Sequence, residues 1–233
     1  FNRAPEASGM ANWVPSLASN VAMTDPSVVT MAGNMLASTE GLAFFPSTMS
    51  NTDFVGRIYM AGMGRTPDAT TWNRWVTQLN GGTSRAQVAL NIINATLGYV
   101  SDGTTSDANR WALERQHLYI NKVSVATAYA VLGGAAGSAT TTVLTKVTAG
   151  DTLLAMHDVL AAIPAIGNRI KAVQVGQLLF NAAPSANQIL DWTAKLNAGM
   201  TMPQLLAAIL AAPEGVAAYP AVQTNAAIVQ TLY

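Results

Sequence analysis

The chain has 233 residues, half of them apolar and one tenth charged, and its 12 Lys and Arg residues balance its 12 Asp and Glu residues. A chain of this length and apolar content can bury a sizeable core, which excludes a disordered protein, and its balanced charge gives no overall field that would attract nucleic acid. Because cysteine is absent, disulfides, thiolate zinc sites and cysteine nucleophiles are excluded.

The first segment predicts two helices. The stretch "FNRAPEASGMANWVPSLASN" begins at Phe1, inside a motif that returns twice, so we expect a further helix to precede this residue. Pro15 disturbs the second half of the motif. The stretch "DPSVVTMAGNMLAS" then predicts a helix that starts at Pro26, because proline is favoured at the first helical position.

The next segment, "TDFVGRIYMAGMGRTPDATTWNRWVTQLNGG", predicts two helices joined by a tight turn. Gly64 can end the first helix in a left-handed conformation. Thr66 can serve as the N-cap of the second helix, with Pro67 at its first position and Asp68 near its positive end. Four apolar residues of the second helix stand at i, i+3, i+4 and i+7 and form one face: Trp72, Trp75, Val76 and Leu79.

Two helices with clear capping signals follow. Ser84 and Gln87 stand at capping-box spacing and open "RAQVALNIINATL". The stretch "SDANRWALERQHLYINKVSVATAYAVLGG" predicts one long helix or two abutting ones, with Ser106 or Asp107 as the N-cap. The pair Gly133-Gly134 is the expected stop.

The segment after these glycines is more ambiguous. The stretch "SATTTVLTKVTAGD", residues 138–151, is rich in Thr and could form a strand or begin a helix; we predict a connector. The stretch "DTLLAMHDVLAAI" predicts a helix that Asp151 caps and Pro164 ends. The stretch "RIKAVQVGQLLFNAAP" is the helix that leads into the third copy of the motif.

In the third copy, Pro184 opens a helix through Trp192, and Thr201 starts the helix of "PQLLAAILAA". Its apolar run from Leu205 to Ala212 is among the longest in the chain, yet it is shorter than the roughly 18 residues that a membrane-spanning helix needs. We therefore expect no transmembrane segment.

The three copies share one pattern, in which a Pro precedes a Trp by eight positions and a Leu follows four later. The members are Pro5, Trp13 and Leu17; Pro67, Trp75 and Leu79; and Pro184, Trp192 and Leu196. The Trp and Leu of each copy share a helix face, so we predict that they are core residues rather than a sugar-stacking set. The copies are spaced irregularly, by 62 and then 117 positions.

Period-two alternation is nearly absent, so the predicted class is all-α. We expect divergent helix-pair repeats that stack in a bundle or a short irregular solenoid. Residues 1–233 are predicted to form one helical repeat domain, with possible sub-modules at 1–100 and 101–233.

The strings "GRTPDATTWNRWVTQLNGG" and "INKVSVATAYAV" resemble an uncharacterised helical domain of secreted bacterial proteins, whose members repeat "GRxPDxxGxxxWxxxLxxG" and carry an "NKVEVxxYY" segment. Thr71 stands where the pattern has Gly, and the first copy keeps that glycine as Gly9. The third copy keeps only Pro184, Trp192 and the end from Leu196 to Gly199. The resemblance implies a helical-repeat fold.

The resemblance also implies a location and a role. Members of this family often belong to type I secreted calcium-repeat proteins, and the chain is similar to the N-terminal domain of alphaproteobacterial surface-layer proteins. That domain holds the layer to the cell by binding lipopolysaccharide O-antigen. We therefore expect an extracellular chain at the bacterial cell surface, forming the N-terminal part of a longer secreted protein. The lack of a basic and apolar signal near Phe1 agrees with type I export, which reads a C-terminal signal.

Arginine and aromatic residues are the candidates for glycan contacts. A guanidinium offers fork-like donors to hydroxyls, carboxylates or phosphates, although each Arg could also belong to a solvated helix face. Five aromatic residues are less tied to the repeat and could be core residues or sugar contacts: Trp72, Trp111, Tyr59, Tyr99 and Tyr119. The predicted glycan-binding residues are Arg65, Arg74, Arg85, Arg110, Arg115, Trp72 and Trp111.

A loop, "SDGTTSD" from Ser101 to Asp107, offers the hard oxygen ligands that calcium accepts. Asp102 and Asp107 are the candidate calcium ligands, and a plain turn with an Asp N-cap is the alternative. The histidines are His117 and His157, and no nucleophile elbow, zinc-protease motif, phosphate loop or dinucleotide glycine pattern accompanies them. We therefore predict no enzymatic activity.

These observations predict a non-catalytic anchoring domain of a surface-layer-type protein that binds lipopolysaccharide O-antigen or another surface glycan. The alternative is a structural self-assembly module of an extracellular lattice or filament, with Phe44 to Pro46 and the Ala-rich C-terminal segment as its interface. The expected partners are the surface glycan, other copies of the chain or the rest of its own chain, with calcium as a possible cofactor.

Overall fold

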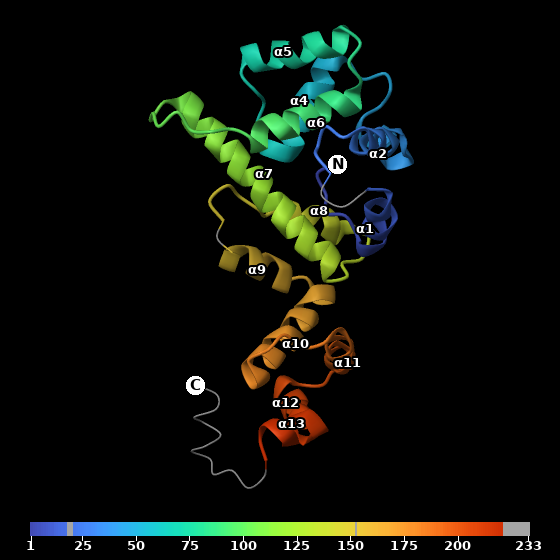
Figure 1. The fold of residues 1–233 in the computed structure, drawn as a ribbon, viewed down its shortest axis with the longest axis vertical. Coiled ribbons are helices and arrows are strands. Elements are labelled where there is room, and N and C mark those ends of the chain that lie inside the picture. The colour runs from blue at the N-terminus through green and yellow to red at the C-terminus, as the bar shows by residue number, and fades with distance from the viewer. Residues whose placement is uncertain (18–20, 152, 221–233) are drawn as a thin grey trace. The chain divides into compact units, whose positions relative to one another are not determined.

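The computed structural model describes residues 1–17, 21–151 and 153–220, and within these ranges the chain forms helices joined by short turns, with no strand (Figure 1). The all-α prediction is confirmed. The elements up to residue 100 are α1 (Ala7–Trp13), a 3₁₀ turn (Val14–Ser16), α2 (Pro26–Ala37), α3 (Thr39–Phe44), α4 (Asn51–Met63), α5 (Ala69–Asn80) and α6 (Arg85–Leu97). The remaining helices are α7 (Asp107–Val131), α8 (Ser138–Thr145), α9 (Leu153–Ala161), α10 (Pro164–Phe180), α11 (Ala186–Asn197), α12 (Met202–Ala211) and α13 (Pro213–Ala218).

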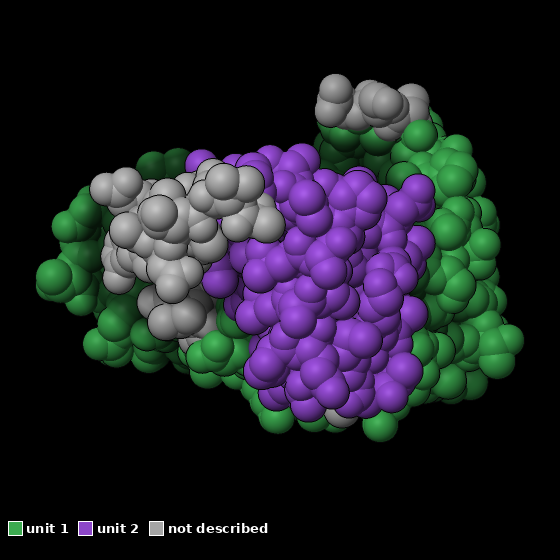
Figure 2. Space-filling view, turned by 90° about the horizontal axis from the view of Figure 1, so that it is seen from below, with its two compact units in different colours: residues 1–160 green, residues 161–233 purple. Residues whose placement is uncertain are grey.

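The chain divides into two compact units, Phe1–Leu160 and Ala161–Tyr233, which Figure 2 draws in different colours. The sub-modules expected from the sequence would separate at residue 100, between α6 and α7. These two helices pack against each other, and α7 also contacts α4 and α8. The helices on both sides of residue 100 therefore belong to one unit.

The core of the first unit lies between α4, α5 and α6. As predicted, Trp75 and Leu79 are buried, and their neighbours in this cluster are Phe45, Phe54, Val55, Tyr59, Met63, Val88 and Ile92. The segment from Phe44 to Pro46 was a candidate interface, but Phe45 is only 7% exposed and its ring centroid lies 5.1 Å from that of Phe54. Phe45 therefore stabilises the core rather than an outer surface. The other candidate interface, the Ala-rich C-terminal segment, lies beyond residue 220 for much of its length and so outside the described ranges.

The second unit repeats the arrangement of α4, α5 and α6 in α10, α11 and α12. Its core includes the predicted Trp192 and Leu196, together with Ala172, Val175, Leu179, Leu205 and Ile209. A side-chain amide bond recurs at the same place: Asn51 donates to Asn80 at 2.8 Å, and Asn168 donates to Asn197 at 2.8 Å. Each bond joins the first helix of a copy to the end of its second helix.

A further copy lies between these two along the chain, and no Pro or Trp marks it. In the copy that contains Trp75, the buried positions are 75, 79, 88 and 92, and the same spacing recurs in Val143, Val147, Met156 and Leu160. Trp192, Leu196, Leu205 and Ile209 repeat it again. The gap of 117 positions between the second and third motifs therefore contains a copy whose tryptophan is replaced by valine.

This hidden copy corrects the prediction of a connector over residues 138–151. The segment begins with α8, in which Val143 and Leu144 are buried. Thr140 and Thr142 donate their hydroxyls to the backbone oxygens of Gly137 and Ser138, so these threonines satisfy their polar groups within the helix. The many Thr and Val residues of this segment have low helix propensity, so the sequence did not predict the helix, which the burial of its apolar residues stabilises.

The first copy departs from the predicted core pattern. Trp13 is half-buried and lies in neither core cluster. Helix α1 ends at Trp13, and Pro15 lies in the short 3₁₀ turn that follows, so Leu17 does not share a helix face with the tryptophan. The prediction that Trp13 is a core residue is wrong for this reason.

Several helix caps also differ from prediction. Asp68 caps α5 by accepting from the N–H of Thr71, so Thr66 and Pro67 precede the helix. Ser185 caps α11 in the same way, one residue after Pro184. The expected capping of α9 by Asp151 involves residue 152, which lies outside the described ranges.

Other capping predictions are confirmed. Ser106 caps α7, Ser84 caps α6, and Thr201 caps α12 within a complete capping box. Gly64 ends α4 with a φ of 73°, in the left-handed region that glycine adopts at no steric cost. The sharp turn after α4 therefore depends on this glycine.

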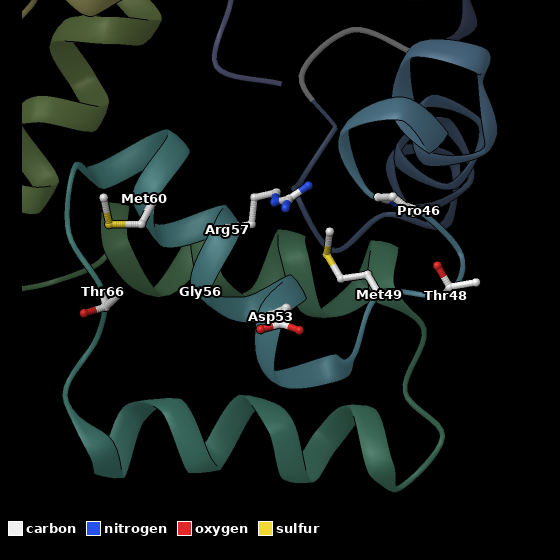
Figure 3. A pocket seen from close by; sticks show the side chains of 8 residues that line it. All are labelled: Pro46, Thr48, Met49, Asp53, Gly56, Arg57, Met60 and Thr66. Carbon is white, nitrogen blue, oxygen red and sulfur yellow. The ribbon is translucent and has the colours of Figure 1, made fainter.

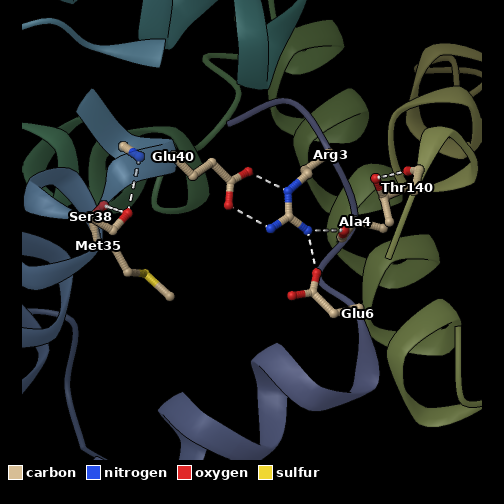
Figure 4. Close-up of polar contacts among 9 residues, drawn as sticks. Arg3, Ala4, Glu6, Met35, Ser38, Glu40 and Thr140 are labelled. Carbon is tan, nitrogen blue, oxygen red and sulfur yellow. Dashed lines mark hydrogen bonds and ion pairs between the residues drawn. The ribbon is translucent and has the colours of Figure 1, made fainter. Parts of the chain in front are cut away.

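The N-terminal segment is tied to two parts of the first unit (Figure 4). Arg3 forms ion pairs with Glu6 and Glu40, and the N–H of Ala4 donates to the carbonyl of Thr140 at 2.7 Å. The hydrogen bonds from Arg3 lower the pKa of Glu40 below its usual range. These contacts join the first residues of the chain to α3 and α8.

We predict that Gly41→Ala strongly destabilises the chain. A Cβ at Gly41 would meet the carbonyl oxygen of Met35 far inside van der Waals contact, because the backbone of α3 passes directly over the end of α2. We expect the free energy of unfolding to fall by roughly 1–3 kcal/mol or more in urea titrations. Gly150→Ala is the matched control, since a Cβ there meets no atom within 4 Å; equal effects of the two substitutions would contradict the prediction.

A second stability prediction concerns Thr193, whose buried hydroxyl has no hydrogen-bond partner among the residues that the structure describes. The corresponding residue of the second copy is Val76, so we expect Thr193→Val to raise the free energy of unfolding by about 1 kcal/mol. Thr140 is also buried, but its hydroxyl donates to Gly137 at 2.6 Å. Thr140→Val should therefore lower the free energy of unfolding by about 1 kcal/mol, and thermal unfolding of both variants tests this opposite sign.

Candidate functional site

Two of the five candidate arginines are engaged within the fold. Arg85 donates to the backbone carbonyls of Pro46 and Met49, and its guanidinium lies 5.0 Å from the ring centroid of Phe54. Arg110 forms an ion pair of 2.9 Å with Asp107. Both guanidiniums thus have structural partners, and Arg85 in particular holds the segment before α4.

The other three candidates, Arg65, Arg74 and Arg115, take part in none of the ion pairs found among the described residues. The guanidinium of Arg65 lies over the ring of Trp111, 4.0 Å from its centroid. That of Arg74 lies 4.2 Å from the ring centroid of Trp75. We call Arg65, Arg74, Arg115 and Trp111 the arginine–tryptophan cluster.

The turn between α4 and α5 places Arg65 against α7. Arg65 follows Gly64 in the turn, and the turn rests on α7, because a Cβ at Gly64 would lie 2.8 Å from Cδ2 of Leu118. Trp111, Arg115 and Leu118 stand at i, i+4 and i+7 of α7, so they share one face of that helix. The face that supports the turn therefore also carries Trp111 and Arg115.

Tyr59 lies between the charged groups of this region. Its phenol oxygen accepts a hydrogen bond of 3.0 Å from Nε1 of Trp75, and both side chains are buried. Burial raises the pKa of Tyr59, whereas the bond from Trp75 and the charges of Arg115 and Arg74 lower it. The hydroxyl therefore stays protonated and feels both cations.

Asp68 is a carboxylate on which the charge of Arg115 acts. Its oxygens accept from the backbone N–H and the hydroxyl of Thr71, each at 2.8 Å. Chiefly the bond from the Thr71 backbone lowers the pKa of Asp68, and the charge of Arg115 lowers it further. Asp68 thus acts as the cap of α5. Glu114, exposed next to Arg115 on α7, is a second carboxylate of this region, and among the described residues neither acid forms an ion pair with the three guanidiniums.

Trp72 does not join the cluster. Its Nε1 donates to the carbonyl of Thr52 at 3.3 Å, and its ring packs so closely on α4 that a Cβ at Gly56 would lie 3.0 Å from Cζ2. Of the other aromatic candidates, Tyr99 donates to Asn109 at 2.7 Å, and Tyr119 packs against the core. These residues stabilise the fold.

A hollow of about 520 Å³ lies along the outer side of α4 (Figure 3). It is lined by Pro46, Thr48, Met49, Asp53, Gly56, Arg57, Met60 and Thr66. Arg57 donates to the carbonyl of Phe44, and Asp53 accepts from the hydroxyl of Ser50 at 2.7 Å. This hollow was not predicted from the sequence, in which its signal is the recurrence of Asp53, Arg57 and Met60 on one helix face.

The predicted calcium loop is closed by its own hydrogen bonds. Asp102 accepts from the N–H and the hydroxyl of Thr104, and Asp107 pairs with Arg110. The buried amide of Asn109 donates to the carbonyl of Thr104 at 2.6 Å. Within the described ranges no group of three or more His, Asp or Glu side chains is placed to hold a metal ion, and calcium binding by Asp102 and Asp107 stays a prediction.

The two histidines lie on different helices, His117 on α7 two residues after Arg115 and His157 on α9. His117 is exposed on α7, and Nδ1 of His157 lies 3.2 Å from Oδ1 of its neighbour Asp158. Among the helices that the structure describes, none is long and apolar enough to cross a membrane.

Comparison with known proteins adds one match. Residues 32–96 match a family model described as "Domain of unknown function (DUF4214)". This range includes Arg65 and Arg74 but ends before α7, which carries Trp111 and Arg115. No match was found among curated proteins or among solved structures.

We predict a pH-dependent effect of Tyr59→Phe. An unfolded tyrosine ionises near pH 10, whereas Tyr59 in the folded chain keeps its proton to higher pH, so the free energy of unfolding falls above about pH 10. The variant lacks this loss, but it leaves Nε1 of Trp75 without a partner and should be less stable by about 1 kcal/mol at neutral pH. Urea titrations between about pH 8 and 11 should show that the difference in free energy of unfolding between the unaltered chain and the variant becomes smaller as the pH rises. A difference that stays constant over this range would contradict the prediction.

Proposed function

We propose that the chain is a non-catalytic domain that anchors a secreted bacterial protein to the cell surface by binding a surface glycan, such as lipopolysaccharide O-antigen. The observation that carries the proposal is the arginine–tryptophan cluster. In it, the guanidinium of Arg65 lies over Trp111, which is 37% exposed, and Arg115 follows Trp111 by one turn on the same face of α7. Arg74 lies over Trp75, and none of the three arginines has an ion-pair partner among the described residues. The resemblance of the repeat to a helical domain of secreted bacterial proteins supports the same function.

The chemistry of the cluster suits a sugar. A pyranose has apolar C–H faces that an exposed indole can cover, and hydroxyls that accept hydrogen bonds from guanidinium N–H groups. Arg65 and Arg74 already lie on aromatic rings, so their side chains are ordered before a ligand arrives. Binding therefore costs less conformational entropy than it would with freely moving side chains.

A second candidate function is self-assembly into an extracellular lattice or filament. One observation favours it: three apolar side chains, those of Ile120, Val123 and Val131, are exposed along one face of α7, with the exposed Thr127 between them. Val131 is 75% exposed. A largely apolar stripe of this kind suits a contact with another protein surface.

The two functions are separated by binding to cell envelopes isolated from the bacterium that produces the chain. If the chain is a glycan anchor, it should sediment with intact envelopes and remain in solution when their lipopolysaccharide has been stripped. Arg65→Gln and Arg115→Gln should each lower the affinity for envelopes, measured by cosedimentation, by about tenfold, because each variant loses one charge-assisted hydrogen bond.

Arg110→Gln is the matched control, because Arg110 lies on the same helix as Arg115 but pairs with Asp107. It should bind envelopes like the unaltered chain. Equal binding to intact and stripped envelopes would contradict the glycan anchor. Concentration-dependent light scattering that Val123→Ser abolishes would then support self-assembly.

A further inference from the structure

We infer that the glycan bound at the arginine–tryptophan cluster carries an oxyanion, a carboxylate or a phosphate, and that this group binds among Arg65, Arg74 and Arg115. The inference rests on the proposed function and specifies the chemistry of its ligand. The hydroxyls of a neutral sugar could accept hydrogen bonds from the guanidiniums, but they would not neutralise the positive charge of the three arginines.

The first support is the excess of positive charge. The whole chain carries equal numbers of acidic and basic residues. In this region the charges of Arg74 and Arg115 both act on Tyr59, and Arg65 lies over Trp111 on the helix face that also carries Arg115. The three guanidiniums outnumber the two carboxylates of the region, those of Asp68 and of the exposed Glu114. Both oxygens of Asp68 are already engaged by Thr71. An incoming anion would therefore meet cations that no nearby acid neutralises at ion-pair distance.

The second support is the contrast with other arginines of the first unit. Arg3 is paired with Glu6 and Glu40, Arg110 is paired with Asp107, and Arg57 and Arg85 donate to backbone carbonyls. The fold thus provides oxygen acceptors for guanidiniums that hold its segments together. For Arg65, Arg74 and Arg115, the described part of the chain provides none within hydrogen-bond distance.

The third support is the way in which two of these guanidiniums are held. Cζ of Arg65 lies 4.0 Å from the ring centroid of Trp111, and Cζ of Arg74 lies 4.2 Å from that of Trp75, so each guanidinium is held against an aromatic ring. The N–H donors lie in the plane of the group and stay free at its edge. The bond from Trp75 to Tyr59 fixes the indole on which Arg74 rests. The result is a set of oriented forks, the arrangement that binds carboxylate and phosphate.

The hollow along α4 differs in this respect. Its charged residues are one acid and one base, Asp53 and Arg57, and both already have partners within the fold. Its charges balance, so it offers no comparable attraction for an anion. The oxyanion site is therefore assigned to the turn between α4 and α5 and to the facing surface of α7.

The test uses the whole chain and probes that differ only in charge. Polygalacturonate carries a carboxylate on each sugar, and its methyl ester has the same backbone without the charge. In calorimetric titrations the acid should bind at least about tenfold more tightly than the ester, and more weakly at high salt because ions screen the attraction. Arg74→Gln and Arg115→Gln should each reduce acid binding about tenfold, whereas Arg110→Gln should not.

Inorganic phosphate and treated envelopes distinguish the source of the oxyanion. Competition by phosphate for the polygalacturonate site would show that both anions use the same forks. Envelopes treated with phosphatase should lose binding if the natural group is a phosphate, and envelopes with esterified carboxylates should lose it if the group is an acidic sugar. Circular dichroism of each Arg variant verifies that its helices are intact.

The outcomes separate this inference from the proposed function. Equal binding of acid and ester, or envelope binding that neither treatment reduces, would overturn the oxyanion site while leaving glycan anchoring in place. If the chain binds phosphate or polygalacturonate through these arginines but does not bind intact envelopes, the oxyanion site is supported and the anchor is overturned. Failure of both anionic probes and of envelopes would overturn both.

Discussion

The structure depends on the burial of one pair of side chains, four positions apart, in the copies of the repeat that contain Trp75, Val143 and Trp192. Trp75 and Leu79 fill this place in one copy, and Trp192 and Leu196 fill it in another. Their burial fixes the second helix against the first and third helices, because a helix of about 12 residues is only marginally stable without tertiary contacts.

The hidden copy shows which part of this constraint is essential. Val143 and Val147 occupy the same two positions and are equally buried, although a valine is far smaller than a tryptophan. What persists is the spacing of apolar residues over the second and third helices. The identity of the aromatic residue is free to change when its neighbours change with it, as expected for cores that conserve total volume.

The sequence was sufficient to predict the helices with strong periodicity and the caps at Ser84, Ser106 and Thr201, because these depend on contacts within four residues. It was not sufficient for α8, where burial outweighs the low helix propensity of Thr and Val, or for Trp13, where Pro15 ends the helix early. For the candidate site, residue types pointed to the arginines. Which of them meet was not predictable, because Arg65 and Trp111 belong to different helical segments, and Arg85 finds its partners in the segment before α4.

The amide bond that recurs between Asn51 and Asn80 and between Asn168 and Asn197 has an evolutionary consequence. In both copies it joins residues of the same copy, and the apolar residues around the buried tryptophan come largely from that copy as well. Duplication of such a segment copies a complete set of mutually satisfied groups, so the new copy can fold before its contacts with neighbours have been refined. A copy can also differ in its motif residues, as the valine-containing copy does, provided that the spacing of its buried apolar residues is kept.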